Sequence, residues 1–596
     1  MKDKLKITNP DDFWFSSSHP VDGRAVRFHF DEFMVEWIST VYDGIRDEGI
    51  FTEVYKYIKP ELIEIYIKQA LYVDLVGTIR ELYRRQFVSN HYGCTTHKKI
   101  VSTSAKVELI SRYWDGDETK HLKVIYFYTT YKKLVGVIEN LKKKLYKLFY
   151  VKEDKVTSNN SDRSTIVVEL VEGIDTNNKC DAFWLNAGII NPERVIFLLE
   201  KSNYGFVDVE KEKTTADRIN SKIVTIDTGA HQLPGVEFWY DNKQPEWGIL
   251  LCQKIRKSNL GQFWLKQTLL DLLTKVSFWE NFYRYYNVAV YQHFTELSVS
   301  SIIRRIACDR VGAIQVGKQR SQFFFKASAA FYFNHEVAFC WHRKIKDVLL
   351  YGKTCPSVLL ETGYVYDYIQ SVCTDDVAAI HERFEQKGVT VIISAYDNYP
   401  HRNGHFSNEQ LREFYLCLYK ILHNYSSVGI IVKSKKHHIT NFSFVKNVIN
   451  DMVETGRCLV FDEPFTSVIP SAKASNIAVG IPASTAVTEA ATTGCFTVMY
   501  DPSRCEIVPL QNHNCSDIGY TIEEFEKKLE NRINSSSGER CHEYPLDVSP
   551  YDDNNAPFRA AKFLNDYIEL KDGGLSKNEA LNGAIGRNRS VVVSSN

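Results

Sequence analysis

The segment Asn476–Asp501 places hydroxyl and carboxyl side chains at a spacing suited to binding a nucleotide. Ser484 and Thr485 stand where an apolar run (477–481) passes into a helical pattern, and Glu489 follows one turn later. A helix N-terminus has unpaired N–H groups and partial positive charge, which favour hydroxyl side chains and attract phosphate. A carboxylate one turn further on can accept hydrogen bonds from a ribose diol. The pattern predicts that these three residues bind a nucleotide, although a plain helix cap would also explain Ser484.

Polar residues also follow other predicted strands of the same region. Asp397 ends one strand, and Lys433 and Lys435 lie in a basic loop after the next. In open α/β sheets, ligands bind outside the carboxyl ends of the strands. The lysines can neutralise phosphates there, but a solvated loop explains them equally well. Gly363 and Tyr364 form a turn between two predicted sheets, and either a backbone contact to a donor phosphate or a plain linker fits this turn.

Candidate bases occur earlier in the chain. His293 and Glu296 follow an apolar run and precede a helical pattern over 298–310, so both are expected at a strand's carboxyl end. Either can act as a general base on an acceptor hydroxyl, because its pKa can be shifted toward neutrality. A helix cap would explain Glu296 without catalysis. Asp227, at another strand end, is the competing base.

Metal and cofactor signatures are few. Asp115 and Asp117 form a DxD, but no apolar strand runs into it, and a turn is the expected structure. The sequence has no HExxH, no Cys/His metal spacing, no P-loop, no GxSxG and no GxGxxG. We therefore expect no metal, and metalloprotease, NTPase and NAD-binding functions lose their usual support.

Composition narrows the classes of partner. Lys+Arg and Asp+Glu both number 73, so the balanced charge argues against bulk nucleic-acid binding. The 13 cysteines show no CxxC pair and are expected to be thiols of a reducing compartment. The N-terminus lacks an apolar signal core and no run reaches the length of a membrane span, which predicts a cytoplasmic protein. The basic amphipathic pattern over 131–149 fits either a helix at the inner membrane surface or a solvated face.

These residues need a scaffold of alternating strands and helices. A chain of 596 residues is too long for one core. The alternation of predicted strands and helices along the chain predicts an α/β fold with two Rossmann-like, doubly wound domains, at 116–350 and 351–571. Residues 1–115 are predicted as a helical N-terminal extension, and 572–596 as a mobile tail. A helix opened by Pro192 is expected over 192–201.

Part of the chain is similar to a known family. Residues 360–510 contain ISAYDN, IIVKSKKHH, FDEP and ASNIAVGIPASTAVTEAATTGCFTVMYD. These motifs resemble GT-B glycosyltransferases of the bacterial surface-polysaccharide type, a branch with capsule and lipopolysaccharide (Kdo-transferase-like) enzymes. In that branch, a strand ending in Lys and an S/T-x(3–4)-E-A-x(3)-G helix hold the nucleotide. One departure is KSKKHH, where KxHP is common. The N-terminal half resembles the family only in layout.

The resemblance implies two domains facing a cleft and a metal-independent glycosyltransferase without a cofactor. Its donor would be a CMP- or UDP-linked nucleotide sugar, and its acceptor a glycan or a lipid-linked glycan. Two rivals stay open: a sugar-nucleotide epimerase of the same layout, and a non-catalytic scaffold of a polysaccharide assembly complex. The sugar, the linkage and the oligomeric state do not follow from the sequence.

Overall fold

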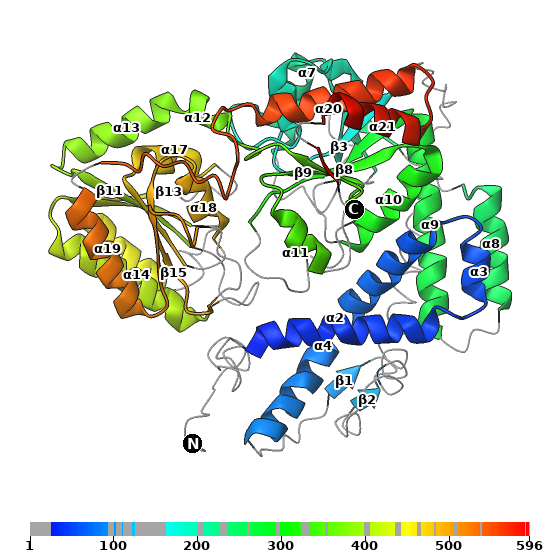
Figure 1. Cartoon of the computed structure of the whole chain (residues 1–596), viewed down its shortest axis with the longest axis horizontal. Helices are drawn as coiled ribbons and strands as arrows, with labels where there is room; N and C mark the ends of the chain where they lie inside the picture. The colour runs from blue at the N-terminus through cyan, green and yellow to red at the C-terminus, as the bar shows by residue number, and fades with distance from the viewer. Residues whose placement is uncertain are drawn as a thin grey trace.

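The chain forms two α/β units beside each other, with long N-terminal helices below one of them (Figure 1). The structure is a computed structural model. It describes residues 26–92, 100–102, 110, 122–124, 163–200, 208–226, 236–239, 241, 243–258, 263–293, 298–322, 334–351, 356–397, 406–434, 443–461, 467–481, 484–504, 510–536, 539–589 and 592–594.

The first sheet has nine strands within the described residues, in the order β17-β10-β9-β8-β7-β3-β4-β5-β6. All neighbours pair in parallel except β17, which is antiparallel to β10. The strands are β3 (Thr165–Glu169), β4 (Val195–Leu199), β5 (Lys222–Thr225), β6 (Glu237–Phe238), β7 (Val288–Gln292), β8 (Ile314–Lys318), β9 (Val337–Cys340), β10 (Val358–Glu361) and β17 (Val592–Ser594).

The second sheet is parallel throughout, in the order β13-β12-β11-β14-β15-β16. Its strands are β11 (Val391–Tyr396), β12 (Val428–Lys433), β13 (Cys458–Phe461), β14 (Ile477–Gly480), β15 (Phe496–Tyr500) and β16 (Ser516–Gly519). The strand order reverses between β3 and β7 in the first sheet and between β11 and β14 in the second. Both sheets are therefore doubly wound, and the predicted pair of Rossmann-like domains is confirmed.

Helices cover the faces of both sheets. Those of the first are η3 (Phe183–Ala187), α7 (Val209–Arg218), α8 (Glu246–Lys257), α9 (Phe263–Tyr285), α10 (Val299–Val311) and α11 (Ile345–Tyr351). Those of the second are α12 (Ile369–Val372), α13 (Thr374–Glu385), α14 (Asn408–Asn424), α16 (Ser443–Glu454), α17 (Ile469–Ala474), α18 (Thr485–Ala491) and α19 (Ile522–Ser536). Helix α14 begins with a capping box, in which Ser407 and Gln410 exchange side-chain to backbone hydrogen bonds.

The N-terminal helices are not a separate unit. They are α2 (Val26–Ile45), α3 (Ile50–Val54) and α4 (Pro60–Tyr92), and a short parallel pair β1 (Ile100–Ser102) and β2 (Leu122–Val124) follows. Their apolar side chains share one core with α9, α10 and a face of the first sheet, including Val167 and Tyr291. Burial of this face explains why a helical extension is stable here.

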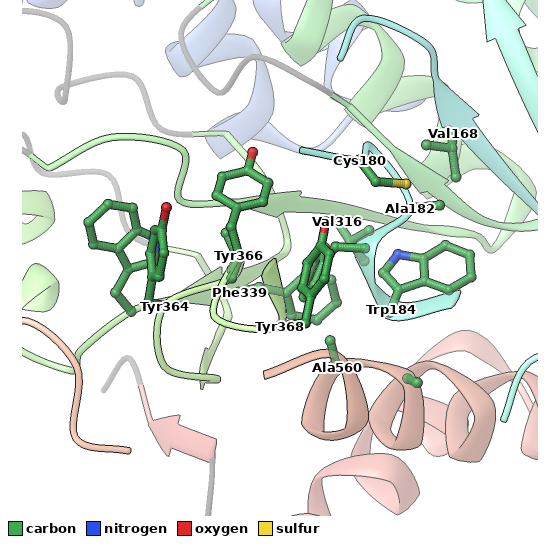
Figure 2. Packing of buried hydrophobic residues seen from close by; sticks show 14 of the residues in the cluster. Val168, Cys180, Ala182, Trp184, Val316, Phe339, Tyr364, Tyr366, Tyr368 and Ala560 are labelled. Atoms are coloured by element: carbon green, nitrogen blue, oxygen red, sulfur yellow. The ribbon is translucent and has the colours of Figure 1, made fainter. Parts of the chain in front are cut away.

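The C-terminal region departs from the sequence-based expectation. Residues 572–596 are not a mobile, aperiodic tail within the described part, because α21 (Lys577–Arg587) and β17 occupy it. Helix α20 (Ala556–Asp572) returns from the second sheet and packs against η3 and α21 on the first (Figures 1 and 2). Lys577 is 9% exposed and contacts Asp309 at 3.0 Å and Glu336 at 2.8 Å. These buried contacts fix the segment that composition alone marked as polar.

The domain boundaries shift accordingly. Strand β10 lies beyond the predicted boundary at 350 yet pairs with β9, and α20 and α21 join the first sheet. The first domain is therefore discontinuous, with the second sheet inserted between β10 and α20. Figure 2 shows Trp184 and Tyr368 above helix α20, which carries Ala560. The same apolar cluster contains Ala478 and Val487 of the second domain, so a continuous core joins the two.

Two smaller predictions also need correction. Residues 192–194 form a single 3-10 turn (η4), and 195–199 form β4 instead of a helix. All five residues of β4 are buried, as expected of a central parallel strand, which needs apolar side chains on both faces. Cys515 and Cys541 form a disulfide, whereas the other eight described cysteines are buried.

Candidate functional site

The switch point of the second sheet, between β11 and β14, carries several of the predicted nucleotide residues. Asp397 follows β11, and Ser484 and Thr485 follow β14. At Gly480, a Cβ would lie 2.4 Å from a Val487 methyl carbon and 3.1 Å from the Tyr396 carbonyl oxygen. The glycine thus lets α18 begin close against the strand ends.

Ser484 holds the N-cap position of α18 without capping it. It is 5% exposed, and its side chain accepts no hydrogen bond from the first turn of the helix. The cap interpretation of Ser484 is therefore not what the structure contains. The Thr485 Oγ1 accepts a hydrogen bond from the Gln322 N–H at 3.2 Å, which ties α18 to the loop after β8.

Glu489 is paired across the two domains. Its carboxylate accepts hydrogen bonds from Lys179 Nζ at 3.2 and 3.3 Å, and the Glu489 side chain is 3% exposed. The Lys179 ammonium also lies 5.0 Å from the centre of the Tyr366 ring. A buried carboxylate needs such a counter-charge. A ribose diol would have to replace Lys179 to reach Glu489.

The loop that delivers Lys179 is fixed at its base. Asp181 Oδ2 accepts three consecutive backbone N–H groups, those of Val171 at 2.7 Å, Glu172 at 2.7 Å and Gly173 at 3.1 Å. The Ile174 N–H donates to Glu212 at 2.6 Å. Burial raises the pKa of the Asp181 carboxyl above its usual range, against the opposing attraction of Lys318.

The tip of the same loop touches the second domain. Asn178 Oδ1 accepts the Ser467 N–H at 3.2 Å, and the Tyr368 hydroxyl donates to the Asn178 carbonyl oxygen at 2.6 Å. Together with the Lys179–Glu489 pair, these bonds bring the carboxyl edges of the two sheets into contact.

Lys318 neutralises this edge of the first sheet. It is 1% exposed, and its Nζ donates to Glu172 at 2.6 Å and to the Cys180 carbonyl oxygen at 2.7 Å. The Tyr366 hydroxyl also donates to Glu172, at 2.6 Å. Burial alone would raise the pKa of Glu172, but Lys318 and Lys179 hold it below its usual range.

The switch point of the first sheet contains His293 in a buried charged chain. His293 follows β7, and its Nδ1 lies 3.3 Å from Glu169 at the end of β3. Its Nε2 faces Arg304, which also pairs with Glu200. Because arginine can only donate, Nε2 must accept and the ring proton sits on Nδ1. His293 is 1% exposed, and both ring nitrogens are engaged within the protein.

The other predicted site residues divide into three groups. Glu296, Asp227 and Lys435 lie outside the described residues. Lys433 ends β12 and is 8% exposed. Asp397 is 3% exposed and accepts hydrogen bonds from the Tyr415 hydroxyl at 2.7 Å and the Ser434 hydroxyl at 3.1 Å. Asp397 thus has a structural role in joining β11, β12 and α14.

Gly363 and Tyr364 are enclosed by the returning C-terminal segment. The Tyr364 N–H donates to Ser549 Oγ at 3.2 Å, so this donor is not directed at a ligand. Gly363 has φ +83°, and a Cβ would lie 3.1 Å from Ser549 Oγ. Tyr364 is fully buried, and its ring meets Trp341 edge-on at 4.9 Å. Ser549 therefore already accepts the Tyr364 N–H, and the backbone contact of this turn to a donor phosphate stays a prediction.

Sequence reasoning missed Lys179, Glu172 and Lys318. Lys318 stands at the end of an apolar run, the position that was used to select His293, and could have been found in the same way. Lys179 lies in a polar loop, and its partner is 310 residues away in the sequence. No local pattern marks it.

The described residues hold neither a metal-binding cluster nor a membrane-spanning helix. They contain no group of three or more His, Cys, Asp or Glu side chains arranged to hold a metal ion. None of the helices in these ranges is long and apolar enough to cross a membrane. The Asp115–Asp117 pair and the basic pattern over 131–149 fall outside the ranges.

No family model and no curated protein matches the chain. Among solved structures, it is similar to a UDP-GlcNAc 2-epimerase from Neisseria meningitidis bound to UDP-GlcNAc, with 9% identity and a TM-score of 0.44 over 68% of this chain and 100% of that one. It is also similar to Anabaena HepE in complex with UDP and glucose, with 8% identity and a TM-score of 0.37 over 72% and 99%. A glycosyltransferase from Rickettsia africae gives 12% identity and a TM-score of 0.41 over 68% and 99%. With TM-scores below 0.5, these likenesses assign neither a family nor an activity.

Proposed function

We propose that the protein binds a nucleotide sugar where the two switch points meet, and transfers the sugar to an acceptor hydroxyl as a metal-independent glycosyltransferase. The supporting observation is the Lys179–Glu489 pair, which joins the carboxyl edges of two doubly wound sheets. Ligands of such sheets bind at this place. The donor would be UDP- or CMP-linked, and the acceptor a surface glycan or lipid-linked glycan at the cytoplasmic face of a membrane.

The donor half of the site uses the second domain. Glu489 would accept hydrogen bonds from the ribose diol, after displacement of Lys179. The Ser484 hydroxyl, which makes no capping hydrogen bond to α18, would bind the phosphates together with the first N–H groups of that helix. Lys433 would add positive charge. These groups stabilise the negative charge of a departing nucleoside phosphate, which is the role a metal fills elsewhere.

The acceptor half uses the first domain. A base must remove the proton of the attacking hydroxyl, and His293, Glu296 and Asp227 remain the candidates. His293 can serve only if Arg304 moves away from Nε2, since that nitrogen is otherwise occupied. Glu169 would then hold the protonated ring through Nδ1.

A sugar-nucleotide epimerase is the second candidate, favoured by one observation. Epimerisation needs acid and base carboxyls around the sugar, and Glu172 and Asp181 are both buried beside the bridging loop. A non-catalytic scaffold would retain the donor site without turnover.

Turnover with a panel of UDP- and CMP-sugars separates the three. Acceptor-dependent release of nucleotide supports transfer, interconverted sugar nucleotides support epimerisation, and binding without turnover supports a scaffold. Glu489→Gln is expected to weaken UDP or CMP binding about tenfold, equivalent to about 1.4 kcal/mol, measured by calorimetry. Glu526→Gln, which removes a surface partner of Lys420, is the matched control. Equal affinity of Glu489→Gln and the control would remove Glu489 from the site.

A further inference from the structure

The disulfide Cys515–Cys541 lies at one edge of the second domain. The two residues are 26 apart in sequence, and their Cα atoms are 6.1 Å apart. Cys515 directly precedes β16, the edge strand of the sheet. Cys541 lies in the described segment 539–555, which has neither helix nor strand. The disulfide is thus a covalent link between this segment and the sheet, beside hydrogen bonds from His513 and Asn514 to Glu543.

The residue beside the disulfide binds the ends of two helices. Arg540 donates to the carbonyl oxygens of Thr493 at 2.6 Å and Ala472 at 3.3 Å, and also to that of Lys473. Ala472 and Lys473 belong to the last turn of α17, and Thr493 follows α18. A cation at helix C-termini satisfies unpaired carbonyl groups and interacts favourably with both helix dipoles.

Cys541 itself bonds Gly494, which lies just after the C-terminal end of α18. Its N–H donates to the Gly494 carbonyl oxygen at 2.9 Å. Gly494 has φ +87°, and a Cβ there would lie 3.1 Å from the Cys541 carbonyl oxygen, so the two backbones are in close contact. The C-terminal end of α18 therefore depends on where 540 and 541 are placed.

Helix α18 is only seven residues long, and it carries Glu489. In so short a helix, a shift at the C-terminal end moves the whole element, because one turn spans about 5.4 Å. The ion pair Lys179–Glu489 and the hydrogen bond from Gln322 to Thr485 also restrain α18, from the first domain. A change at the disulfide can thus reach the residues assigned to the nucleotide.

We infer that the Cys515–Cys541 disulfide is a redox-sensitive clamp on α18, and that its reduction weakens the site containing Glu489. A dithiol reductant donates two electrons: the sulfur–sulfur bond breaks, Cys515 and Cys541 each gain a proton as thiols, and the reductant closes its own disulfide. The freed segment then no longer holds Arg540 against α17 and α18. The nucleotide part of this inference rests on the proposed function.

Hydrogen exchange tests the clamp without any ligand. In the full chain, reduction with dithiothreitol is expected to speed amide exchange over 484–494 by roughly tenfold, which is the signature of local opening. Arg540→Gln with the disulfide intact should do the same. Arg532→Gln is the control, because within the described residues Arg532 donates to Asp517 at 2.6 Å and to the Asn514 carbonyl oxygen at 3.0 Å, near the disulfide but away from α17 and α18. Unchanged exchange over 484–494 after complete reduction overturns the inference.

UDP and CMP binding tests the consequence. The protein is expected to bind one of the two nucleotides. Its affinity for that nucleotide should be about tenfold higher in the oxidised form than in the reduced form, a difference of about 1.4 kcal/mol in binding free energy. The double variant Cys515→Ser/Cys541→Ser should match reduced protein and ignore dithiothreitol. If that variant fails to fold, reduction and reoxidation of the wild-type chain give the same comparison. Equal affinity in both redox states overturns the nucleotide part. Failure of both nucleotides to bind in either state, with exchange still redox-sensitive, overturns the proposed function and leaves the clamp.

Discussion

The two switch points differ in how their charges are balanced. At the first, Glu169, His293, Arg304 and Glu200 form a chain that is complete within one domain. At the second, Glu489 has a partner from the other domain. The first edge therefore has its charges satisfied before any ligand arrives, whereas the second depends on an exchangeable contact.

This difference indicates a division of labour. Buried ion pairs that are fully partnered are rigid, because loss of one partner leaves an uncompensated charge. Such an edge suits the positioning of a substrate. In the proposed function, the lysine that reaches across from the other domain is displaced when a nucleotide enters. Four substitutions test whether the contrast is real.

The largest effect is expected from Lys318→Met. This change leaves Glu172 without the ammonium group that donates to it directly and should lower the free energy of unfolding by about 3–5 kcal/mol. Urea denaturation measures the loss. Lys344→Met is the control, because Lys344 is 60% exposed and pairs with Asp547 at the surface, where ion pairs contribute little. Similar losses in both variants would contradict the view that the first edge is a rigid, partnered unit.

Asp367→Asn tests a buried carboxyl of the first domain whose pKa is raised. Burial raises the pKa of Asp367 to about 7, against the opposing effects of a hydrogen bond from the Ala556 N–H at 3.2 Å and of the positive charge of Arg559. In the unfolded chain the ordinary pKa of an aspartate is near 3.8, so the folded state binds more protons between pH 3.8 and about 7, and stability falls as pH rises through this window.

Removing the charge of Asp367 should therefore increase the stability of the folded protein at high pH only. At pH 8, we expect Asp367→Asn to be more stable than wild type by about 2 kcal/mol, and near pH 4 the difference should vanish. Thermal and urea unfolding at both pH values measure this difference. A variant that is less stable at pH 8 would show that the ionised carboxylate is stabilising.

Gly363→Ala tests the enclosure of the end of β10. At φ +83° a side chain costs about 1–2 kcal/mol, and the new Cβ would meet Ser549 at 3.1 Å. Gly586→Ala is the control: it lies in α21 with nothing within 4 Å of the added Cβ, and alanine favours a helix. A lower unfolding midpoint for the first and an unchanged or higher one for the second are expected. Equal behaviour would mean that the C-terminal segment adapts freely around Gly363.

The smallest effect is expected from Lys179→Met. Because the ribose no longer has to displace the ammonium, UDP or CMP affinity should rise a few-fold, in the way that removing a competing state raises apparent affinity. Calorimetry compares it with Lys211→Met, a 61% exposed lysine that faces Asp175 of the same loop at 3.9 Å. Weaker binding of Lys179→Met than of the control would instead place the ammonium on the nucleotide.

Local patterns predicted the elements well and the contacts poorly. The strand–helix–strand unit at 477–500 follows from an apolar run, a hydroxyl pair and a glycine, all within one short segment. The capping box at Ser407 is equally local. By contrast, β4 is apolar on all sides, and helix and strand patterns cannot be told apart in so short a run.

The partners of the site residues depend on the tertiary fold. Asp397 is typical of a ligand-binding strand end, yet Tyr415 and Ser434 occupy it. The Gly363 turn is enclosed by Ser549, 186 positions later in the numbering, and no periodicity indicates that return. Polar composition over 572–596 favoured a mobile tail because composition does not register the ion pairs of Lys577.

The position of β17 at the edge of the first sheet has a consequence for biosynthesis. The antiparallel partner of strand β10 is β17, which is translated more than 200 residues later. Helices α20 and α21, also translated late, cover a face of the first sheet, whose strands begin with β3. The first domain therefore cannot complete its fold during synthesis before the second domain, although N-terminal domains usually fold first. Chains stalled after residue 555 should remain sensitive to protease in the first domain; resistance there would show that the sheet closes early.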